Sequence, residues 1–235
     1  MNCLCNSNDY RIVYRFTSLP SSVMIVKCLQ CGLHRTYPPP IDSKLGISNY
    51  TEAVEKEPEI SEERRRKTYK KIITTIKRKI TWTSKINVLD IGCSVGYFVK
   101  YAKESGLNCL GLDIDTCAIE YSYHKFNHSK LCVADADALP LGKDIFDTVI
   151  LNHVFEHLRY PIKVLGQINK VLKHGGILFL IMPHHRGLIV RLRPLSWQGW
   201  RPEMHIWHFT PSIITELLKK QGFKIIYLKL IRLHT

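Results

Sequence analysis

The pattern of hydrophobic and polar positions changes its period repeatedly from residue 86 onward. Short apolar runs, which fit buried strands, alternate with segments whose apolar residues recur every three or four positions, which fit helices. The runs that predict strands are 86–91, 108–113, 130–134, 146–151, 176–182 and 223–230. The segments that predict helices are 97–105, 116–126, 161–176 (ending at His-Gly-Gly) and 211–222. Because strands alternate with helices and are largely apolar on both faces, we expect a parallel sheet covered by helices on both sides.

Upstream of this pattern the chain divides into two segments. Residues 1–40 end in the run Tyr-Pro-Pro-Pro, which stops regular structure and marks a boundary. Within residues 41–82, apolar side chains recur at helical spacing from Ser61 onward with basic residues between them, which predicts an amphipathic helix packed on the next domain. These apolar residues are Tyr69, Ile72, Ile73, Ile76 and Ile80. Residues 83–235 are then expected to form the main domain.

The composition is that of a globular chain with a strongly basic surface. Hydrophobic residues make up 45% of the 235 residues, and the formal net charge is +14. This charge favours an anionic partner such as nucleic acid, lipid headgroups or a phosphate-bearing substrate. A basic surface that only faces solvent accounts for the same net charge. No apolar run approaches the 18 or so residues of a membrane span, and the N-terminus lacks a basic segment followed by an apolar one. We therefore expect a cytoplasmic protein without a transmembrane segment, for which peripheral membrane contact stays open.

The turn after the first predicted strand lies in the sequence VLDIGCSVGYF at 88–98. Gly92 and Gly96 allow a tight backbone and leave the space in which a Cβ would meet a close ligand. A helix begins at about Gly96, so its free amides point to whatever lies in the turn. Asp113 ends the second strand, where a carboxylate can accept hydrogen bonds from both hydroxyls of a ribose. The turn and the carboxylate together predict a nucleoside cofactor.

These segments, with two that follow the third strand, resemble the motifs of class I S-adenosylmethionine-dependent methyltransferases. VLDIGCSVGYF resembles the first motif of the family, LGLDID the second, and ADADALPLGKDIFDTVILNHVFEHL the third and fourth. The C-terminal part, from GGILFLIMPH to the helix at 211–222, is similar to the branch called methyltransferase domain 23. The resemblance spans residues 86–230 and implies a Rossmann-like, mostly parallel sheet of seven strands. Ser94 departs from the family, which usually has a glycine there, but its hydroxyl could bond the cofactor.

Carried over by position, the resemblance implies a set of contacts to each part of the cofactor. The residues that would line the methionine portion are Asp90, Gly92, Ser94 and Gly96. Those that would contact the ribose and the adenine are Asp113, Ile114, Asp135 and Ala136. Asn152, at the end of the fourth strand, would form the floor under the sulfonium. Asp135 and Asp137 have an alternative role, because their side chains can instead cap the loop in which they lie.

The acceptor side of the site is indicated by histidines. Methyl transfer is an in-line displacement, so the protein mainly aligns the reactants, and a base is needed only where the acceptor loses a proton. The histidines near the carboxyl ends of the strands are His153, His157, His184, His185, His205 and His208. We expect His184 or His205 to contact the acceptor, with His157 as the third candidate. A structural role fits each of them equally, and His157 can simply order its loop together with Glu156.

Two further features bear on the acceptor. The position after the fourth strand has neither the Asp/Asn-Pro-Pro-aromatic block of exocyclic-amine methyltransferases nor a cysteine for attack on a cytosine carbon. The segment RGLIVRLRPLSWQGWRP at 186–202 covers the acceptor pocket in the family. Its arginines and tryptophans suit a phosphate or sugar, a membrane surface, or an ordinary lid packed by Trp197 and Trp200.

Four cysteines near the N-terminus form two close pairs, Cys3 with Cys5 and Cys28 with Cys31. The second pair, in the sequence CLQCG, suits a zinc knuckle because its turn aims both sulfurs at one ion and Gly32 relieves the backbone. The first pair has the less usual spacing C-x-C. We predict a structural zinc ion held by four thiolates in a zinc-ribbon-like segment, with unpaired thiols as the alternative.

Together these features predict an enzyme that transfers a methyl group from S-adenosylmethionine to an acceptor. A hydroxyl of a small molecule, a glycan or a glycolipid precursor is the favoured acceptor. The basic stretches at 64–66 and 77–79 favour RNA as the alternative. A binding protein that keeps the cofactor but does not transfer the methyl group is the third hypothesis. The residues that argue against it are the intact Asp90, Gly92, Gly96 and Asp113.

Overall fold

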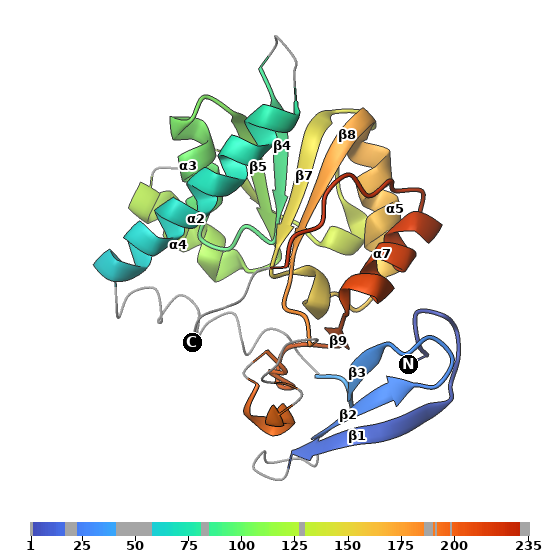
Figure 1. The fold of residues 1–235 in the computed structure, drawn as a ribbon. Coiled ribbons are helices and arrows are strands. Elements are labelled where there is room, and N and C mark those ends of the chain that lie inside the picture. Colours follow the sequence, from blue (N-terminus) through green and yellow to red (C-terminus); the bar gives the residue numbers. More distant parts are fainter. Residues whose placement is uncertain are drawn as a thin grey trace. The chain divides into compact units, whose positions relative to one another are not determined.

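The computed structural model describes residues 2–16, 23–40, 58–80, 85–126, 130–185, 190, 192–197 and 199–230. The chain forms two compact units. The first unit comprises Met1–Ile41, Glu156–Ile162 and Met182–Thr235, and the second comprises Asp42–Phe155 and Lys163–Ile181. Each unit has its own sheet, with the order β1-β2-β3-β9 in the first and β6-β5-β4-β7-β8 in the second (Figure 1).

The sheet of the second unit is parallel throughout. Its strands, in sheet order, are β6 (Leu131–Val133), β5 (Asn108–Asp113), β4 (Asn87–Ile91), β7 (Phe146–Asn152) and β8 (Leu172–Ile181). The two central strands, β4 and β7, are buried along nearly their whole length, as expected of strands covered on both faces. The chain order reverses between them, since β5 and β6 extend the sheet on one side of β4 and β8 extends it on the other. The predicted parallel sheet is therefore confirmed.

Helices cover both faces of this sheet (Figure 1). They are α2 (Pro58–Lys79), α3 (Tyr97–Glu104), α4 (Thr116–Phe126) and α5 (Pro161–Val171). In Figure 1, α2, α3 and α4 lie on one side of the strands and α5 on the other. The isoleucines predicted for the apolar face of the amphipathic helix are buried in one core cluster with side chains of α3 and the sheet. The helix therefore packs on the parallel sheet, as its sequence predicts.

The sheet of the first unit is antiparallel and joins distant parts of the chain. Its strands are β1 (Tyr10–Phe16), β2 (Val23–Cys28), β3 (His34–Tyr37) and β9 (Trp207–His208). Ile25 and Trp200 form a small core here, with Tyr14 packed against them. The helix α7 (Pro211–Lys220) belongs to the same unit, and the Thr210 side chain caps it by accepting from the Ile213 amide at 3.3 Å.

Among the described residues the parallel sheet has five strands, whereas the resemblance implies seven. The run 223–230 was expected to be a strand, but it pairs with no other described segment, and Ile226, Tyr227 and Leu228 are more than half exposed. An apolar run supplies the side chains of a strand, whereas a strand also needs a neighbouring edge with free backbone groups. Along the described segments, no helix is both long enough and apolar enough to cross a membrane.

One predicted boundary also differs. The helix that begins at Pro161 ends at Val171 rather than at the His-Gly-Gly sequence 174–176, because β8 already starts at Leu172. Leu172 pairs with Phe146, and the pairing resumes at Ile177 after an irregularity that contains Gly175 at φ +75°. The glycines therefore lie within an irregular strand rather than at a helix end.

Candidate functional site

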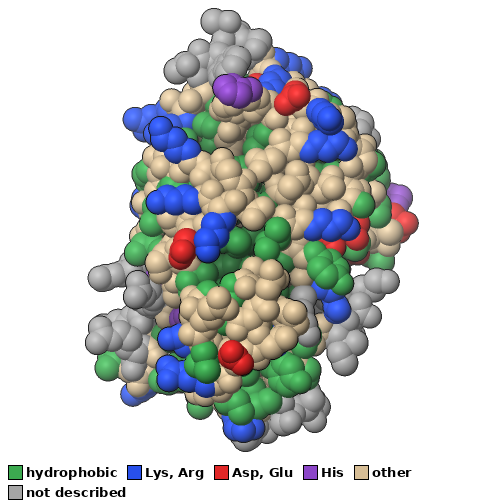
Figure 2. All heavy atoms as spheres, turned by 90° about the vertical axis from the view of Figure 1, so that its right-hand side faces the viewer, with side chains coloured by type: hydrophobic (Ala, Val, Ile, Leu, Met, Phe, Trp, Pro, Cys, Tyr) green, Lys and Arg blue, Asp and Glu red, His purple; other side chains and the backbone are tan. Residues whose placement is uncertain are grey.

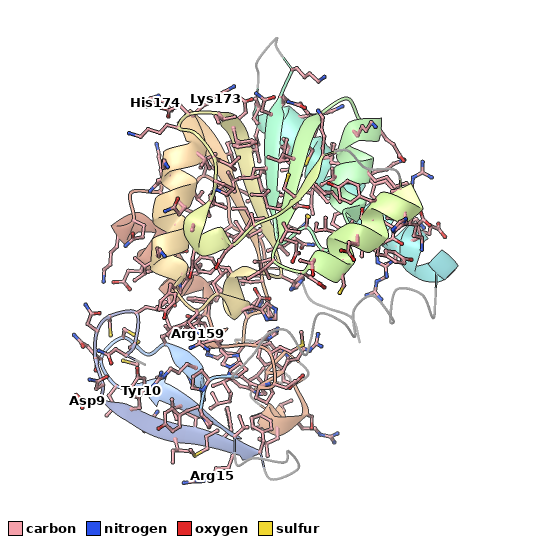
Figure 3. The ribbon with its side chains drawn as sticks, turned by 180° about the vertical axis from the view of Figure 1, so that it is seen from behind. Asp9, Tyr10, Arg15, Arg159, Lys173 and His174 are labelled. Carbon is pink, nitrogen blue, oxygen red and sulfur yellow. The ribbon has the colours of Figure 1, made fainter. Side chains whose placement is uncertain are left out.

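The carboxyl ends of the parallel strands meet at one edge of the second unit's sheet. The residues predicted for the cofactor site lie at this edge, in the loops 92–96 after β4, 114–115 after β5 and 134–138 after β6, and at Asn152, the last residue of β7. The amino ends of the strands lie at the opposite edge, where Lys173 and His174 of β8 are labelled in Figure 3. The topology thus brings four separate predicted segments to one place.

The turn between β4 and α3 has a left-handed backbone at alternate positions. Gly92, Ser94 and Gly96 have φ values of +73°, +50° and +76°. A Cβ on Gly92 would lie 2.3 Å from a methyl group of Val154, and one on Gly96 would lie 2.8 Å from a methyl group of Leu131. The sequence predicts that a ligand occupies this space. The structure corrects that prediction, because the protein's own side chains occupy the space, and the glycines are needed for backbone conformation and packing.

Asp113 ties the end of β5 to this turn. Its Oδ2 accepts a hydrogen bond from the Ser94 amide at 2.6 Å, and its Oδ1 accepts one from the Asp115 amide at 2.9 Å. Burial raises the pKa of Asp113, although the donating amides oppose this shift. An ionised carboxylate offers about four acceptor positions, so this one can still accept from two further donors.

Asp90 lies one strand away and is only 3% exposed. Burial raises its pKa well above the ordinary value, and the negative charge of Asp113 adds to the shift. The edge of the sheet therefore holds two carboxyl groups that repel each other when both are ionised. A positive charge bound nearby would favour their ionised forms.

The loops after β5, β6 and β7 present a mixture of apolar and polar groups. The Ile114 side chain is 52% exposed at the end of β5. Asp135 caps the short helix η1 (Ala136–Ala138), since its Oδ1 accepts from the Asp137 amide at 2.8 Å. Loop capping, the alternative reading of Asp135, is thus what its side chain does here. Asn152 is half-buried at the last position of β7.

In the first unit, the four N-terminal cysteines come together. Sγ of Cys3 lies 3.4 Å from Sγ of Cys31, Sγ of Cys5 lies 3.7 Å from Sγ of Cys28, and all four lie within 4.8 Å of one another. Thiolates about 2.3 Å from a tetrahedral zinc ion are about 3.8 Å apart, so the cluster has nearly the size that zinc requires. The less usual C-x-C spacing of the first pair does not prevent the four sulfurs from meeting.

The cysteines of the cluster differ in pKa. Burial raises the pKa of Cys28, but the backbone amides of Cys31 and Gln30 donate to its sulfur, and the net result is a pKa lowered to about 6. Burial raises the pKa of Cys3 to about 11. A bound cation would favour the thiolate form of both. The arrangement is consistent with a zinc-binding segment.

The histidines predicted for the acceptor side lie in the first unit. The His157 and His205 rings are in edge contact with centroids 4.7 Å apart, and their ligating nitrogens lie within 4.8 Å of a carboxylate oxygen of Glu156. Burial lowers the pKa of His205 to about 4. His184 is half-buried on the segment after β8. Two of the three predicted histidines are therefore brought together.

The sequence does not predict Thr36 beside these histidines, and it predicts for Glu156 only that it orders its loop with His157. Thr36 of β3 donates from its hydroxyl to the carbonyl oxygen of His205 at 2.6 Å, and the same hydroxyl lies 3.0 Å from Nε2 of His208. The adjacent Glu-His pair in the sequence is a signal for both Glu156 and His157, but nothing in the sequence indicates that β3 lies beside β9.

Comparison with known proteins identifies related sequences. The model of a family described as methyltransferase domain matches residues 61–228. A malonyl-(acyl-carrier protein) O-methyltransferase of Pectobacterium atrosepticum is 25% identical over 95 residues, which cover 40% of this chain and 38% of the relative. A ubiquinone biosynthesis O-methyltransferase of Cereibacter sphaeroides is 25% identical over 147 residues, covering 58% and 60%. The chain thus spans less than two thirds of the length of these relatives.

Solved structures share the fold. An S-adenosylmethionine-dependent methyltransferase of Methanosarcina mazei matches with a TM-score of 0.56 and 20% identity, over 66% of this chain and 87% of that one. A methyltransferase of Archaeoglobus fulgidus matches with a TM-score of 0.52 and 23% identity, over 66% and 69%. The cyclase SpnF also matches, with a TM-score of 0.53 and 19% identity, over 67% and 57%. Since a cyclase is among them, the shared fold alone does not determine an activity.

Proposed function

Since the chain belongs to the methyltransferase domain family, we propose that it transfers a methyl group from S-adenosylmethionine to an oxygen atom of a small-molecule acceptor. The observation that carries this proposal is the position of Asp113. Its carboxylate joins the end of β5 to the glycine-rich turn after β4, at the edge where parallel sheets bind ligands.

Asp113 is suited to hold the ribose of the cofactor. It accepts from the amides of Ser94 and Asp115, and these two bonds fix the direction of its carboxylate. The remaining acceptor positions match the two hydroxyl donors of a ribose. Hydroxyl donors also favour the ionised carboxylate, which burial disfavours.

The neighbouring loops fit the other parts of the cofactor. Ile114 offers an exposed apolar side chain against which an adenine ring can pack. The backbone of Ala136 would meet the exocyclic amine of the adenine. Asp135 would meet the same amine through the carboxylate oxygen that does not cap η1. These assignments leave the end of β7, where Asn152 lies, for the sulfonium.

The methionine portion would lie along the turn 92–96. Gly92, Ser94 and Gly96 give this turn its left-handed conformation, and the buried carboxyl group of Asp90 lies near the end of the preceding strand. An α-amino group or a sulfonium is positive, so its approach would stabilise the ionised form of Asp90.

The chemistry divides between the cofactor and the chain. S-adenosylmethionine, when bound, supplies a methyl group on a sulfonium whose thioether leaves readily. The residues of the chain must then align an acceptor oxygen with that methyl group, exclude water, and take up the proton that a hydroxyl loses. His184, His205 and His157 are the candidates for contact with the acceptor. Nδ1 of His157 and Nδ1 of His205 each donate to a backbone carbonyl oxygen, so Nε2 is the nitrogen without a proton in each neutral ring.

An oxygen acceptor is supported by two observations. Two of the relatives described above are O-methyltransferases by name. The segment after β7 reads LNHVFEH and contains neither the motif of exocyclic-amine methyltransferases nor a cysteine. We extend the proposal to a structural zinc ion on Cys3, Cys5, Cys28 and Cys31, which the spacing of the sulfur atoms supports.

Calorimetry with S-adenosylmethionine tests the cofactor assignment. Asp113→Asn is expected to weaken binding about 10-fold to 100-fold, because hydrogen bonds to a charged acceptor are worth about 1.5–3 kcal/mol. Asp144→Asn is the matched control, because Asp144 is exposed before β7 at the opposite edge of the sheet. Equal affinities for wild type and Asp113→Asn would contradict the proposal. Incubation with labelled cofactor and separate pools of small molecules and RNA then identifies the class of the acceptor.

A further inference from the structure

The first unit contains a second cluster of possible ligand atoms, separate from the cysteines. Glu156 and His157 lie in the short helix η2 (Phe155–His157), and His205 lies just before β9. One carboxylate oxygen and one nitrogen from each ring lie within 4.8 Å of one another. Glu156 is 1% exposed and His205 is 5% exposed, so the cluster is built into the interior of the unit.

Backbone hydrogen bonds hold the two segments of the cluster together. The Ile206 amide donates to the carbonyl oxygen of Glu156 at 2.9 Å, and Nε1 of Trp207 donates to the carbonyl oxygen of Leu158 at 2.9 Å. The hydroxyl of Thr36 fixes the carbonyl of His205 from β3. The three side chains are therefore presented by a fixed scaffold, which reduces the entropic cost of closing them on a ligand.

The hydrogen bonds of the two rings determine which nitrogen of each ring carries the proton. Nδ1 of His157 lies 3.1 Å from the carbonyl oxygen of Met204, and Nδ1 of His205 lies 2.9 Å from the carbonyl oxygen of Gly199. A carbonyl oxygen can only accept, so each Nδ1 carries the proton. In the neutral ring Nε2 is then the nitrogen that bears no proton and can act as a ligand atom. Metal-binding histidines have this arrangement, with one nitrogen donating to a carbonyl and the other facing the ion.

We propose that Glu156, His157 and His205 bind a divalent transition-metal ion through one carboxylate oxygen and two Nε2 atoms. Two imidazoles and a carboxylate suit zinc, iron, cobalt or manganese rather than calcium or magnesium. Atoms bound about 2.1 Å from one ion are at most about 4.2 Å apart, so small side-chain rotations close the observed set. Three protein ligands leave coordination positions open for water or for another oxygen ligand.

This site differs in kind from the cysteine cluster. Four thiolates complete the coordination of a structural zinc ion, whereas the Glu-His-His set is incomplete and can take an exogenous oxygen. Where the proposed methyl transfer holds, His157 and His205 would act on an acceptor hydroxyl through the ion, which lowers the pKa of a bound oxygen acid. The existence of the site does not depend on that activity.

Metal analysis and cobalt substitution of the purified chain test the proposal. Wild type is expected to bind about two divalent ions per chain, one at each cluster. With cobalt, the cysteine site gives an intense thiolate charge-transfer band, and the second site gives only weak visible bands. Catechol, a chelating oxygen ligand, should shift the weak bands and leave the thiolate band unchanged.

Variants separate this site from the cysteine cluster. Glu156→Gln keeps the shape of the side chain, and its affinity for the second ion should fall about 100-fold or more, while the thiolate band stays. His208→Gln is the control, because His208 is also a buried histidine of the first unit but lies outside the set. Wild type that binds only the thiolate-held ion, or Glu156→Gln that binds both ions as wild type does, would overturn the proposal. Since binding is measured without turnover, a failed methyl-transfer assay leaves this result unaffected.

Discussion

Gly92 and Gly106 have the same left-handed backbone but different surroundings. Their φ values are +73° and +81°, yet a Cβ on Gly92 would lie 2.3 Å from Val154, whereas one on Gly106 would meet nothing within 4 Å. Gly106→Ala should therefore lower the free energy of unfolding by only about 1–2 kcal/mol, which is the cost of a left-handed backbone for a residue with a Cβ. Gly92→Ala should cost about 1–3 kcal/mol more, because the new methyl group overpacks the turn. Urea denaturation of both variants measures the difference.

A second substitution distinguishes packing from backbone strain at this turn. Val154→Ala removes the methyl groups that the new Cβ would meet, so it should recover part of the stability lost in Gly92→Ala. The same Val154→Ala change should give no recovery in a Gly106→Ala background. Equal costs for the two glycine variants would show that the contact with Val154 is unimportant.

The buried carboxyl of Asp90 predicts a dependence of stability on pH. Burial, with a contribution from Asp113, raises the pKa of Asp90 in the folded chain well above 3.8. Between 3.8 and the folded pKa, the folded state keeps a proton that the unfolded state has released. The free energy of unfolding contributed by this group therefore falls as pH rises, by at most about 1.4 kcal/mol per pH unit.

Asp90→Asn isolates this contribution from the other titrating groups. Asparagine resembles the protonated acid, so the variant should gain stability relative to the cofactor-free wild type as pH rises above about 4. The comparison uses urea denaturation of both proteins at a series of pH values. A difference in unfolding free energy that does not change with pH would show that Asp90 titrates alike in both states.

Among the elements, α2 is attached to the parallel sheet through one apolar face. Ile76 is fully buried in the core shared by α2, α3 and the sheet, while Thr74 on the same helix is exposed. Ile76→Ala should lower the free energy of unfolding by about 2–5 kcal/mol, because it removes buried methyl groups and leaves a cavity. Thr74→Ala should change it by less than about 0.5 kcal/mol. Thermal and urea denaturation compare the two, and equal small effects would mean that the helix contributes little to the core.

Local signals were sufficient for the elements whose sequence and packing agree. β5 and α4 have the predicted bounds, since an apolar run and a following helical pattern are separated by a short turn. The edge that carries Asp90, Asp113 and Asn152 follows from the parallel topology, which the alternation of strands and helices predicts. The meeting of the four cysteines also follows from their spacing in two pairs. The domain boundaries after residues 40 and 82 stay predictions.

Long-range pairing could not be predicted from local signals. β9 comprises only Trp207 and His208, and it pairs with β3 more than 160 residues earlier in the sequence, so no apolar period marks it. The cluster of Glu156, His157 and His205 depends on the same pairing, because Thr36 of β3 and the 204–207 segment hold it in place. The apolar run at 223–230 shows the converse, since this strand-like sequence pairs with no other described segment and forms no strand.

At the scale of the whole molecule, the net charge of +14 raises the question of nucleic acid. Lys and Arg side chains are spread over the face shown in Figure 2 rather than gathered in one patch, and few acidic side chains lie between them. A basic surface of this kind binds any polyanion by releasing counterions. We therefore expect RNA binding that is strong at low salt, independent of sequence and abolished as salt is raised.

Two charge reversals decide whether this binding has a dedicated surface. Lys70 lies on the exposed basic side of α2, and Lys103 is exposed on α3. If the charge acts as a whole, Lys70→Glu and Lys103→Glu should weaken RNA binding equally. Both should also reduce the slope of log affinity against log salt concentration, by about 0.7 for each RNA phosphate that the variant no longer neutralises. Fluorescence anisotropy with unrelated RNA sequences at several salt concentrations measures both. The contrary result is a much weaker RNA affinity for Lys70→Glu than for Lys103→Glu, together with a preference for one RNA sequence. It would make α2 a specific RNA-binding surface and would favour RNA as the methyl acceptor. The reason is that charge spread over the surface distinguishes neither sites on the protein nor RNA sequences.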